Sequence, residues 1–201
     1  MKLHVSILLP LSLFVLPACS DAPPQPPAIG LQVALAPPAA QDNPDGRQCQ
    51  VQPNGSRSYV IGKADGDHTV EDGKDNVDLS CTIRKSNGQV QVDLFAPNQA
   101  VGLPGNFGFN LKATVGSPTD PTQNTGTLGF FDPDAGSLTT PTSPLCTLSP
   151  PAAGKPITLE PGALHAAFNC PLLINVGNPG EGCRASGIVA VEYCKTGEEE
   201  E

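Results

Sequence analysis

Aromatic side chains are scarce in this sequence, which contains no Trp and only two Tyr, Tyr59 and Tyr193. Rings of Trp and Tyr are large, rigid and amphipathic, and they are common anchors of binding surfaces. Trp is also the usual platform on which sugar rings stack. Its absence favours a protein-binding or structural role over a carbohydrate-binding one.

Basic residues are few as well. Lys and Arg number 11 against 20 Asp and Glu, which gives a net charge of −9 at pH 7. Nucleic acids and anionic lipid surfaces both select for clustered Lys and Arg. We therefore expect no nucleic-acid partner, and we expect any membrane association to depend on a covalent anchor or a hydrophobic segment.

Catalytic motifs are lacking too. The chain contains neither a Gly-x-Ser-x-Gly nucleophile elbow nor a His-Glu-x-x-His zinc motif. Beyond the N-terminal segment the only histidines are His68 and His165, and His165 lies on the polar face of an expected strand. We expect no enzymatic activity, no catalytic residue, no cofactor and no metal ligand.

Acidic residues gather in the segment 65–78, and carboxylates are the oxygen ligands that Ca²⁺ takes. When an EF-hand loop is aligned to start at Asp65, Val70 falls where Gly is needed and Asn76 falls where Glu is needed. The segment is therefore interpreted as a solvated turn, with a Ca²⁺-dependent binding or hydrolytic domain as an alternative. The shorter run Asp132–Gly136 is interpreted as a Pro-containing turn.

The first 18 residues have the layout of a signal peptide, with an apolar run (5–16) too short to span a bilayer as a helix. The sequence Leu16-Pro17-Ala18-Cys19 resembles the bacterial lipobox, whose cysteine carries lipid. We therefore predict a lipoprotein anchored through Cys19, at the outer membrane or cell surface rather than the inner membrane. The alternative is an ordinary signal peptide with Cys19 unmodified.

The chain has seven cysteines, and six remain if Cys19 is lipidated: Cys49, Cys81, Cys146, Cys170, Cys183 and Cys194. An even number in an exported chain predicts disulfides. We expect Cys170–Cys183 across a short loop and Cys81–Cys194 between an early strand and the last one. Cys49–Cys146 is then left over, although six cysteines allow many other pairings.

Proline and glycine, at 23 and 21 residues, punctuate the whole chain and argue against long helices. The prolines of segment 19–46 predict an extended, polyproline-like linker behind Cys19. Four successive glutamates predict a solvated acidic tail at 197–201. The folded domain is therefore expected at 47–196.

The clearest local pattern runs from Val77 to Phe95. Apolar and polar residues alternate on both sides of Asn87-Gly88, a dipeptide typical of type I′ hairpin turns. If the chain folds back there, Ile83 lies opposite Val92 and Cys81 opposite Leu94. The pattern predicts a hairpin with one buried face, and a slip of one residue would destroy it.

Several other segments alternate with the same period of two. We expect strands at 58–61, 107–115, 127–131, 157–159, 164–170 and 189–193. Seven or eight short strands separated by Gly/Pro turns predict an all-β fold, a disulfide-braced antiparallel β-sandwich, with a β-barrel as the alternative.

The region from Val77 to Cys194 resembles the mycobacterial surface lipoprotein antigens. The resemblance is carried by the strand and hairpin motifs Leu79-Ser80-Cys81-Thr82 and Asn87-Gly88-Gln89-Val90, and by the closing run Val189-Ala190-Val191-Glu192-Tyr193-Cys194. It implies a non-catalytic envelope lipoprotein that interacts with a host or a neighbouring surface.

Together these patterns predict a non-enzymatic envelope lipoprotein that displays a β domain for surface interaction or structural purposes. Its expected partners are the membrane, through Cys19, and a protein of the cell envelope. A further alternative is a lipid carrier with an apolar cavity. Phe107, Phe109, Phe130 and Phe131 could line such a pocket, but a place in the core is the commoner fate of alternating Phe residues.

Overall fold

The computed structural model describes residues 24–51, 55–63, 69–98 and 106–198, and these residues contain no α-helix. Their strands confirm the expected all-β fold. The strands are β1 (Ala28–Ala36), β2 (Arg57–Ile61), β3 (Val70–Glu71), β4 (Ser80–Ser86), β5 (Gln89–Asn98), β6 (Phe107–Val115), β7 (Asn124–Asp132), β8 (Gly136–Thr139), β9 (Cys146–Ser149), β10 (Thr158–Glu160), β11 (Ala163–Asn175), β12 (Gly182–Glu192) and β13 (Lys195–Glu198). Two short 3₁₀ turns lie at η1 (Ala40–Asp42) and η2 (Pro121–Gln123).

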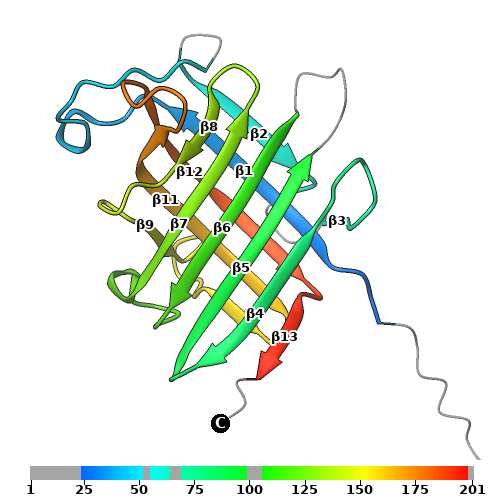
Figure 1. Cartoon of the computed structure of the whole chain (residues 1–201). Helices are drawn as coiled ribbons and strands as arrows, with labels where there is room; N and C mark the ends of the chain where they lie inside the picture. The colour runs from blue at the N-terminus through cyan, green and yellow to red at the C-terminus, as the bar shows by residue number, and fades with distance from the viewer. Residues whose placement is uncertain (1–23, 52–54, 64–68, 99–105, 199–201) are drawn as a thin grey trace, which may run out of the picture.

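The strands form one sheet that folds over on itself into two layers. The strand order is β13-β4-β5-β6-β7-β8-β11-β12-β1-β2. In Figure 1 the layer of β4, β5, β6 and β7 lies in front of the layer of β11, β12, β1 and β2, and the strands of the two layers cross. This is the expected sandwich. The two end strands, β13 and β2, do not pair with each other in the described chain, so the sheet is open.

The two layers are joined along one side by short strands. Both β8 and β9 pair with β7 in the front layer and with β11 in the back layer. On the other side the chain leaves β12 in the back layer and adds β13, in parallel, to β4 in the front layer. The hydrogen-bonded sheet therefore continues from one layer into the other.

The β4–β5 hairpin confirms the register expected from sequence. Ile83 lies opposite Val92 and Cys81 opposite Leu94. Asn87 and Gly88 both have positive φ, at 49° and 78°, as a type I′ turn requires. The expected strands at 58–61, 107–115, 127–131 and 164–170 fall within β2, β6, β7 and β11, while those at 157–159 and 189–193 overlap β10 and β12.

The predicted linker 19–46 is wrong over much of its length, because β1 occupies residues 28–36. Ile29, Leu31, Val33 and Leu35 are almost completely buried, and β1 pairs along all nine residues with β12. The prolines on both sides of β1 led to the linker prediction, but β1 itself alternates, and its apolar face is buried in the core. The folded domain therefore begins by Ala28, not at residue 47.

The C-terminal boundary also differs from the prediction. Gly197 and Glu198, expected in the acidic tail, belong to β13 and pair with Arg84 and Lys85 of β4. The backbone N–H and C=O groups of β13 find partners in β4, and this pairing outweighs the unfavourable composition of the segment.

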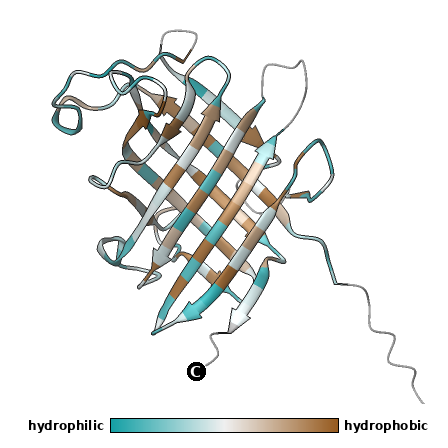
Figure 2. Cartoon of the chain, viewed as in Figure 1, coloured by the Kyte–Doolittle hydropathy of each residue, from teal (hydrophilic) through white to brown (hydrophobic). Residues whose placement is uncertain are grey.

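Alternating hydropathy explains why the sheet folds into layers. Along the front strands apolar and polar residues alternate, as the brown and teal bands of Figure 2 show. The apolar side chains turn inward and build a core whose largest members include Phe107, Phe109 and Phe130. Burial of these rings is a major favourable contribution to folding.

Three disulfides brace the sandwich: Cys49–Cys183, Cys81–Cys194 and Cys146–Cys170. The second confirms the expected pair, while Cys170–Cys183 and Cys49–Cys146 are wrong. The β11–β12 register shifts between Cys170 and Leu173, so Cys183 lies opposite Leu173 and not beside Cys170. Cys170 instead meets Cys146, one step beyond the Asn169–Thr147 pair of β11 and β9.

Candidate functional site

The outward surface of β4, β5, β6, β7 and β8, here called the outer face, carries the candidate site. Inward residues of these strands fill the core, so every second side chain projects to the outside. The strand registers arrange these side chains in transverse rows: Pro97, Gly108, Phe131 and Ser137; Phe95, Asn110, Gly129 and Thr139; Thr82, Asp93, Lys112 and Thr127; and Arg84, Gln91, Thr114 and Thr125.

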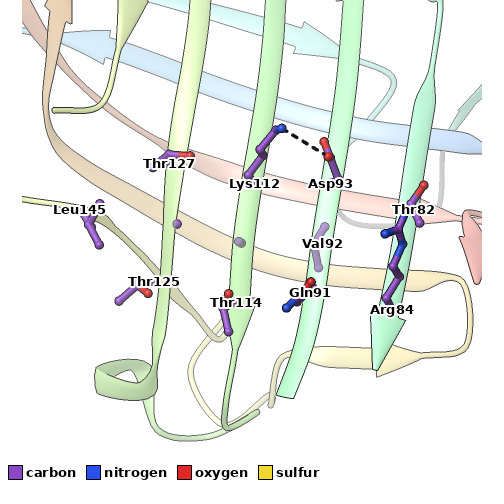
Figure 3. Close-up of a pocket in the computed structure, with 12 residues that line it drawn as sticks. Thr82, Arg84, Gln91, Val92, Asp93, Lys112, Thr114, Thr125, Thr127 and Leu145 are labelled. Atoms are coloured by element: carbon purple, nitrogen blue, oxygen red, sulfur yellow. Dashed lines mark ion pairs between the residues drawn. The ribbon is translucent and has the colours of Figure 1, made fainter. Parts of the chain in front are cut away.

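The two rows farthest from Phe131 line a polar hollow of about 370 Å³. Figure 3 shows its side chains projecting from four neighbouring strands, with Leu145 at its margin. The Lys112 ammonium lies 3.5 Å from the Asp93 carboxylate across β5 and β6. The rest of the polar side chains here are Thr hydroxyls, the Gln91 amide and the Arg84 guanidinium, so the hollow is rich in hydrogen-bonding groups.

At the other end of the outer face lies a more apolar hollow of about 280 Å³, here called the aromatic trough. Phe95 and Phe131 flank it and are each 45% exposed, while Val176, just after β11, is 64% exposed. Single exposed apolar side chains are common on a domain surface, whereas a group of them marks a contact surface. The trough is therefore a candidate binding surface.

The floor of the aromatic trough is glycine backbone, and the packing of the fold does not require glycine there. A Cβ at Gly129 would lie 3.6 Å from the Asn110 Cβ, and one at Gly108 would lie 3.4 Å from the Phe131 Cβ. Both are ordinary contacts, whereas a Cβ at the inward-facing Gly126 would lie 2.7 Å from the Lys112 carbonyl oxygen. Glycine weakens a strand and often marks a place where a ligand approaches the backbone.

A buried polar cluster fixes the end of β7 that carries Phe131. The carboxylate of Asp132, the next residue, is fully buried and accepts a hydrogen bond from the Tyr59 hydroxyl. Its Oδ1 accepts from the backbone N–H groups of Asp134 and Ala135, both at 2.8 Å. The Arg57 guanidinium lies 3.5 Å from Asp132 and 3.0 Å from Asp134.

This cluster also changes the acidity of Tyr59. Burial, and then the hydrogen bond to Asp132, raise the pKa of the Tyr59 hydroxyl well above its ordinary range. The ring of Tyr59 packs against Phe107 and Phe130, with centroids 5.2 and 4.8 Å away. The expected Pro-containing turn at Asp132–Gly136 is confirmed, and its first carboxylate serves as a structural acceptor.

The four Phe residues singled out in the sequence divide between core and surface. Phe107, Phe109 and Phe130 are buried in the core, as alternation favours, while Phe131 faces outward. Phe95 was missed as a site residue although its signal was present: it lies opposite Ser80, on the polar side of the hairpin. An apolar residue at a polar position of an amphipathic strand is the pattern that identifies it.

The apolar cavity of a lipid carrier stays a prediction. The apolar hollow beside Ile83, Val90 and Leu159 measures about 190 Å³. His165 lines a different hollow, of about 470 Å³, on the outside of the back layer, consistent with its expected surface position on a strand.

Only part of the acidic segment 65–78 lies within the described residues. There Asp72 accepts a hydrogen bond at 2.8 Å from the N–H of Leu79 and so stabilises the turn before β4. Across the described ranges no group of three His, Cys, Asp or Glu side chains is arranged to hold a metal ion. Asp65, Asp67 and His68 lie outside those ranges.

The predicted signal peptide and Cys19 lie outside the described residues. In the part of the chain that is described, no helix has the length and hydropathy of a membrane span. Comparison with protein-family models, with curated protein sequences and with solved structures gave no match in any of the three. The resemblance of region 77–194 to the mycobacterial antigens stays a prediction.

Proposed function

We propose that this protein is a non-enzymatic bacterial envelope lipoprotein, anchored through Cys19, whose outer face binds a component of a cell surface. The lipobox-like sequence before Cys19 supports the anchor. Ala28, where β1 begins, follows Cys19 by nine residues, which span at most about 30 Å. An anchored domain would therefore stay close to the membrane.

The observation that carries the binding role is the aromatic trough. Two half-exposed Phe rings flank a floor of two glycines that packing does not require. Replacing either glycine by a residue with a side chain would stabilise the strand, so strand stability does not explain why glycine occupies these two positions. A ligand that contacts the backbone at the floor of the trough would explain it.

Metabolic labelling with radioactive palmitate tests the anchor. Wild-type protein expressed in a bacterium that processes lipoproteins is expected to carry label, and the Cys19→Ala variant is expected to carry none. Ser20→Ala, which leaves the cysteine in place, serves as the matched control. Unlabelled wild-type protein would contradict the lipoprotein assignment.

Cosedimentation with isolated bacterial envelopes tests the outer face. The chain beginning at Ser20, which lacks the apolar run 5–16 and Cys19 but keeps all of β1, removes the contributions of signal peptide and lipid. We expect this protein to sediment with envelopes, and we expect Gly129→Val to abolish sedimentation by filling the trough while the thermal midpoint is kept or raised. Val60→Ala, at an exposed apolar position of β2 in the back layer, is the control. Equal sedimentation of all variants would overturn the proposal.

A further inference from the structure

We propose that the ligand of the outer face is an uncharged oligosaccharide that lies along β5, β6 and β7 from the aromatic trough to the polar hollow. This inference rests on the proposed function, because it names the ligand class of the same face. It departs from the expectation set by the absence of Trp, since two Phe rings occupy the positions where stacking platforms are needed.

The hydrogen-bonding groups of the outer face suit a ligand that carries many hydroxyls. Thr hydroxyls and primary amides each both donate and accept hydrogen bonds. They occupy successive rows between the trough and the far end of the polar hollow, namely Thr139, Asn110, Thr127, Thr82, Thr125, Thr114 and Gln91. A sugar chain offers donors and acceptors of the same kind at every residue.

The charges of the outer face favour a neutral ligand. Of the described residues that line the two hollows, the charged ones are Arg84, Asp93 and Lys112. Asp93 and Lys112 form an ion pair at 3.5 Å and so largely offset each other. In a chain with a net charge of −9, a face so nearly neutral selects neither a cationic nor a strongly anionic partner.

The trough supplies the apolar part of sugar recognition. One face of a pyranose ring presents C–H groups, and such a face packs against an aromatic ring. Phe95 on β5 and Phe131 on β7 are separated by one intervening strand, which places their backbones about 10 Å apart across the sheet. Gly108, on the intervening strand beside Phe131, and Gly129, on β7 across Asn110 from Phe95, leave bare backbone that a ring can approach.

The dimensions of the outer face match a chain ligand. From Phe131 to Thr125 the strand β7 advances six residues, or about 20 Å. The Phe rings stand at one end of this length. In protein interfaces the aromatic anchors cluster near the centre and a polar rim surrounds them. The polarised arrangement seen here fits an elongated ligand that stacks at one end and forms hydrogen bonds along the rest.

Titration calorimetry on the chain beginning at Ser20 tests the inference with hexasaccharides of glucose, of mannose and of galactose as probes. We expect at least one of them to bind, and we expect Phe95→Ala and Phe131→Ala each to weaken its association constant about tenfold. Gly129→Val is expected to abolish binding, with the near-ultraviolet circular dichroism spectrum retained as evidence of folding. Val60→Ala should bind as the parent protein does.

Three outcomes would overturn the inference: no binding of any hexasaccharide, equal binding of the parent and the Phe variants, or equally tight binding of the monosaccharide glucose. If envelopes still sediment the protein in a manner sensitive to Gly129→Val while no sugar binds, the binding face stands and its ligand is a protein. If Gly129→Val affects neither assay, the proposed function fails as well.

Discussion

At the scale of single residues, the most demanding group in this protein is the carboxylate of Asp132. It is fully buried, and its partners are the Tyr59 hydroxyl, the Arg57 guanidinium and two backbone N–H groups. A buried charge is tolerated only when it is paired and hydrogen-bonded. The cluster joins the edge strand β2 to the turn between β7 and β8, and so it holds Phe131 at the margin of the trough.

We predict that Asp132→Ala lowers the free energy of unfolding by about 3–5 kcal/mol, because it leaves Arg57 and Tyr59 without their buried partner. Asp134→Ala removes only the exposed partner of Arg57 and should cost less than about 1 kcal/mol. Urea denaturation followed by circular dichroism measures both. A smaller loss for Asp132→Ala than for Asp134→Ala would contradict this role.

Tyr59 gives a prediction about pH. Its pKa is raised in the folded protein, so the folded state holds the proton more tightly than the unfolded state does. The stabilisation is therefore complete below the ordinary tyrosine pKa of about 10 and is lost as the pH rises above that value. Ultraviolet titration of tyrosinate should show one phenol that ionises only on unfolding, and Tyr59→Phe should remove it. Tyrosinate formation at Tyr59 in the folded protein near pH 10 would refute the prediction.

At the scale of elements, β1 decides where the domain begins. It lies between β12 and β2, and five of its side chains, including the four large ones Ile29, Leu31, Val33 and Leu35, are almost completely buried. Gly187 of β12 shows how closely the two strands approach, because a Cβ there would lie 1.9 Å from the Gln32 carbonyl oxygen of β1. The strand is thus an internal part of the back layer.

We predict that a chain starting at Pro37 does not fold, whereas a chain starting at Pro24 does. Loss of Ile29, Leu31, Val33 and Leu35 removes contacts worth about 2–5 kcal/mol each, and a typical domain has only about 5–15 kcal/mol in total. Dispersed amide signals and a cooperative thermal transition are expected for the longer chain only. Native-like spectra from the shorter chain would show that β1 is dispensable.

At the scale of the whole molecule, the disulfides tie together parts of the chain that are far apart in sequence. Cys49–Cys183 and Cys81–Cys194 span 134 and 113 residues, and Cys146–Cys170 spans 24. Cys81–Cys194 connects β4 to the segment between β12 and β13, on the side of the sandwich where β8 and β9 are absent. It therefore reinforces the open side of the folded sheet.

We predict that the double variant Cys81→Ala/Cys194→Ala lowers the free energy of unfolding by about 5 kcal/mol, and Cys146→Ala/Cys170→Ala by about 3.5 kcal/mol. The difference follows from the chain entropy that each cross-link removes from the unfolded state, which grows with the length of the closed loop. Guanidinium denaturation of the two variants and the parent measures it. A larger loss from the short loop would contradict the ordering.

The sequence by itself determined the all-β character, the β4–β5 register and most of the strands, because alternation and turn chemistry act between residues close in the chain. It did not reveal two of the three cysteine pairs, since these depend on which strands become neighbours and on a register shift in β11. It also concealed β1, whose burial comes only from pairing with β12 and β2.

The candidate site shows the same division. The sequence contained the exposed position of Phe95, but only the tertiary structure placed it near Phe131, in rows that also hold Gly108 and Gly129. A binding face needs side chains from several strands, and their proximity is set by long-range pairing. Local patterns specify which face a residue takes, whereas the packing of the sheet decides which residues share that face.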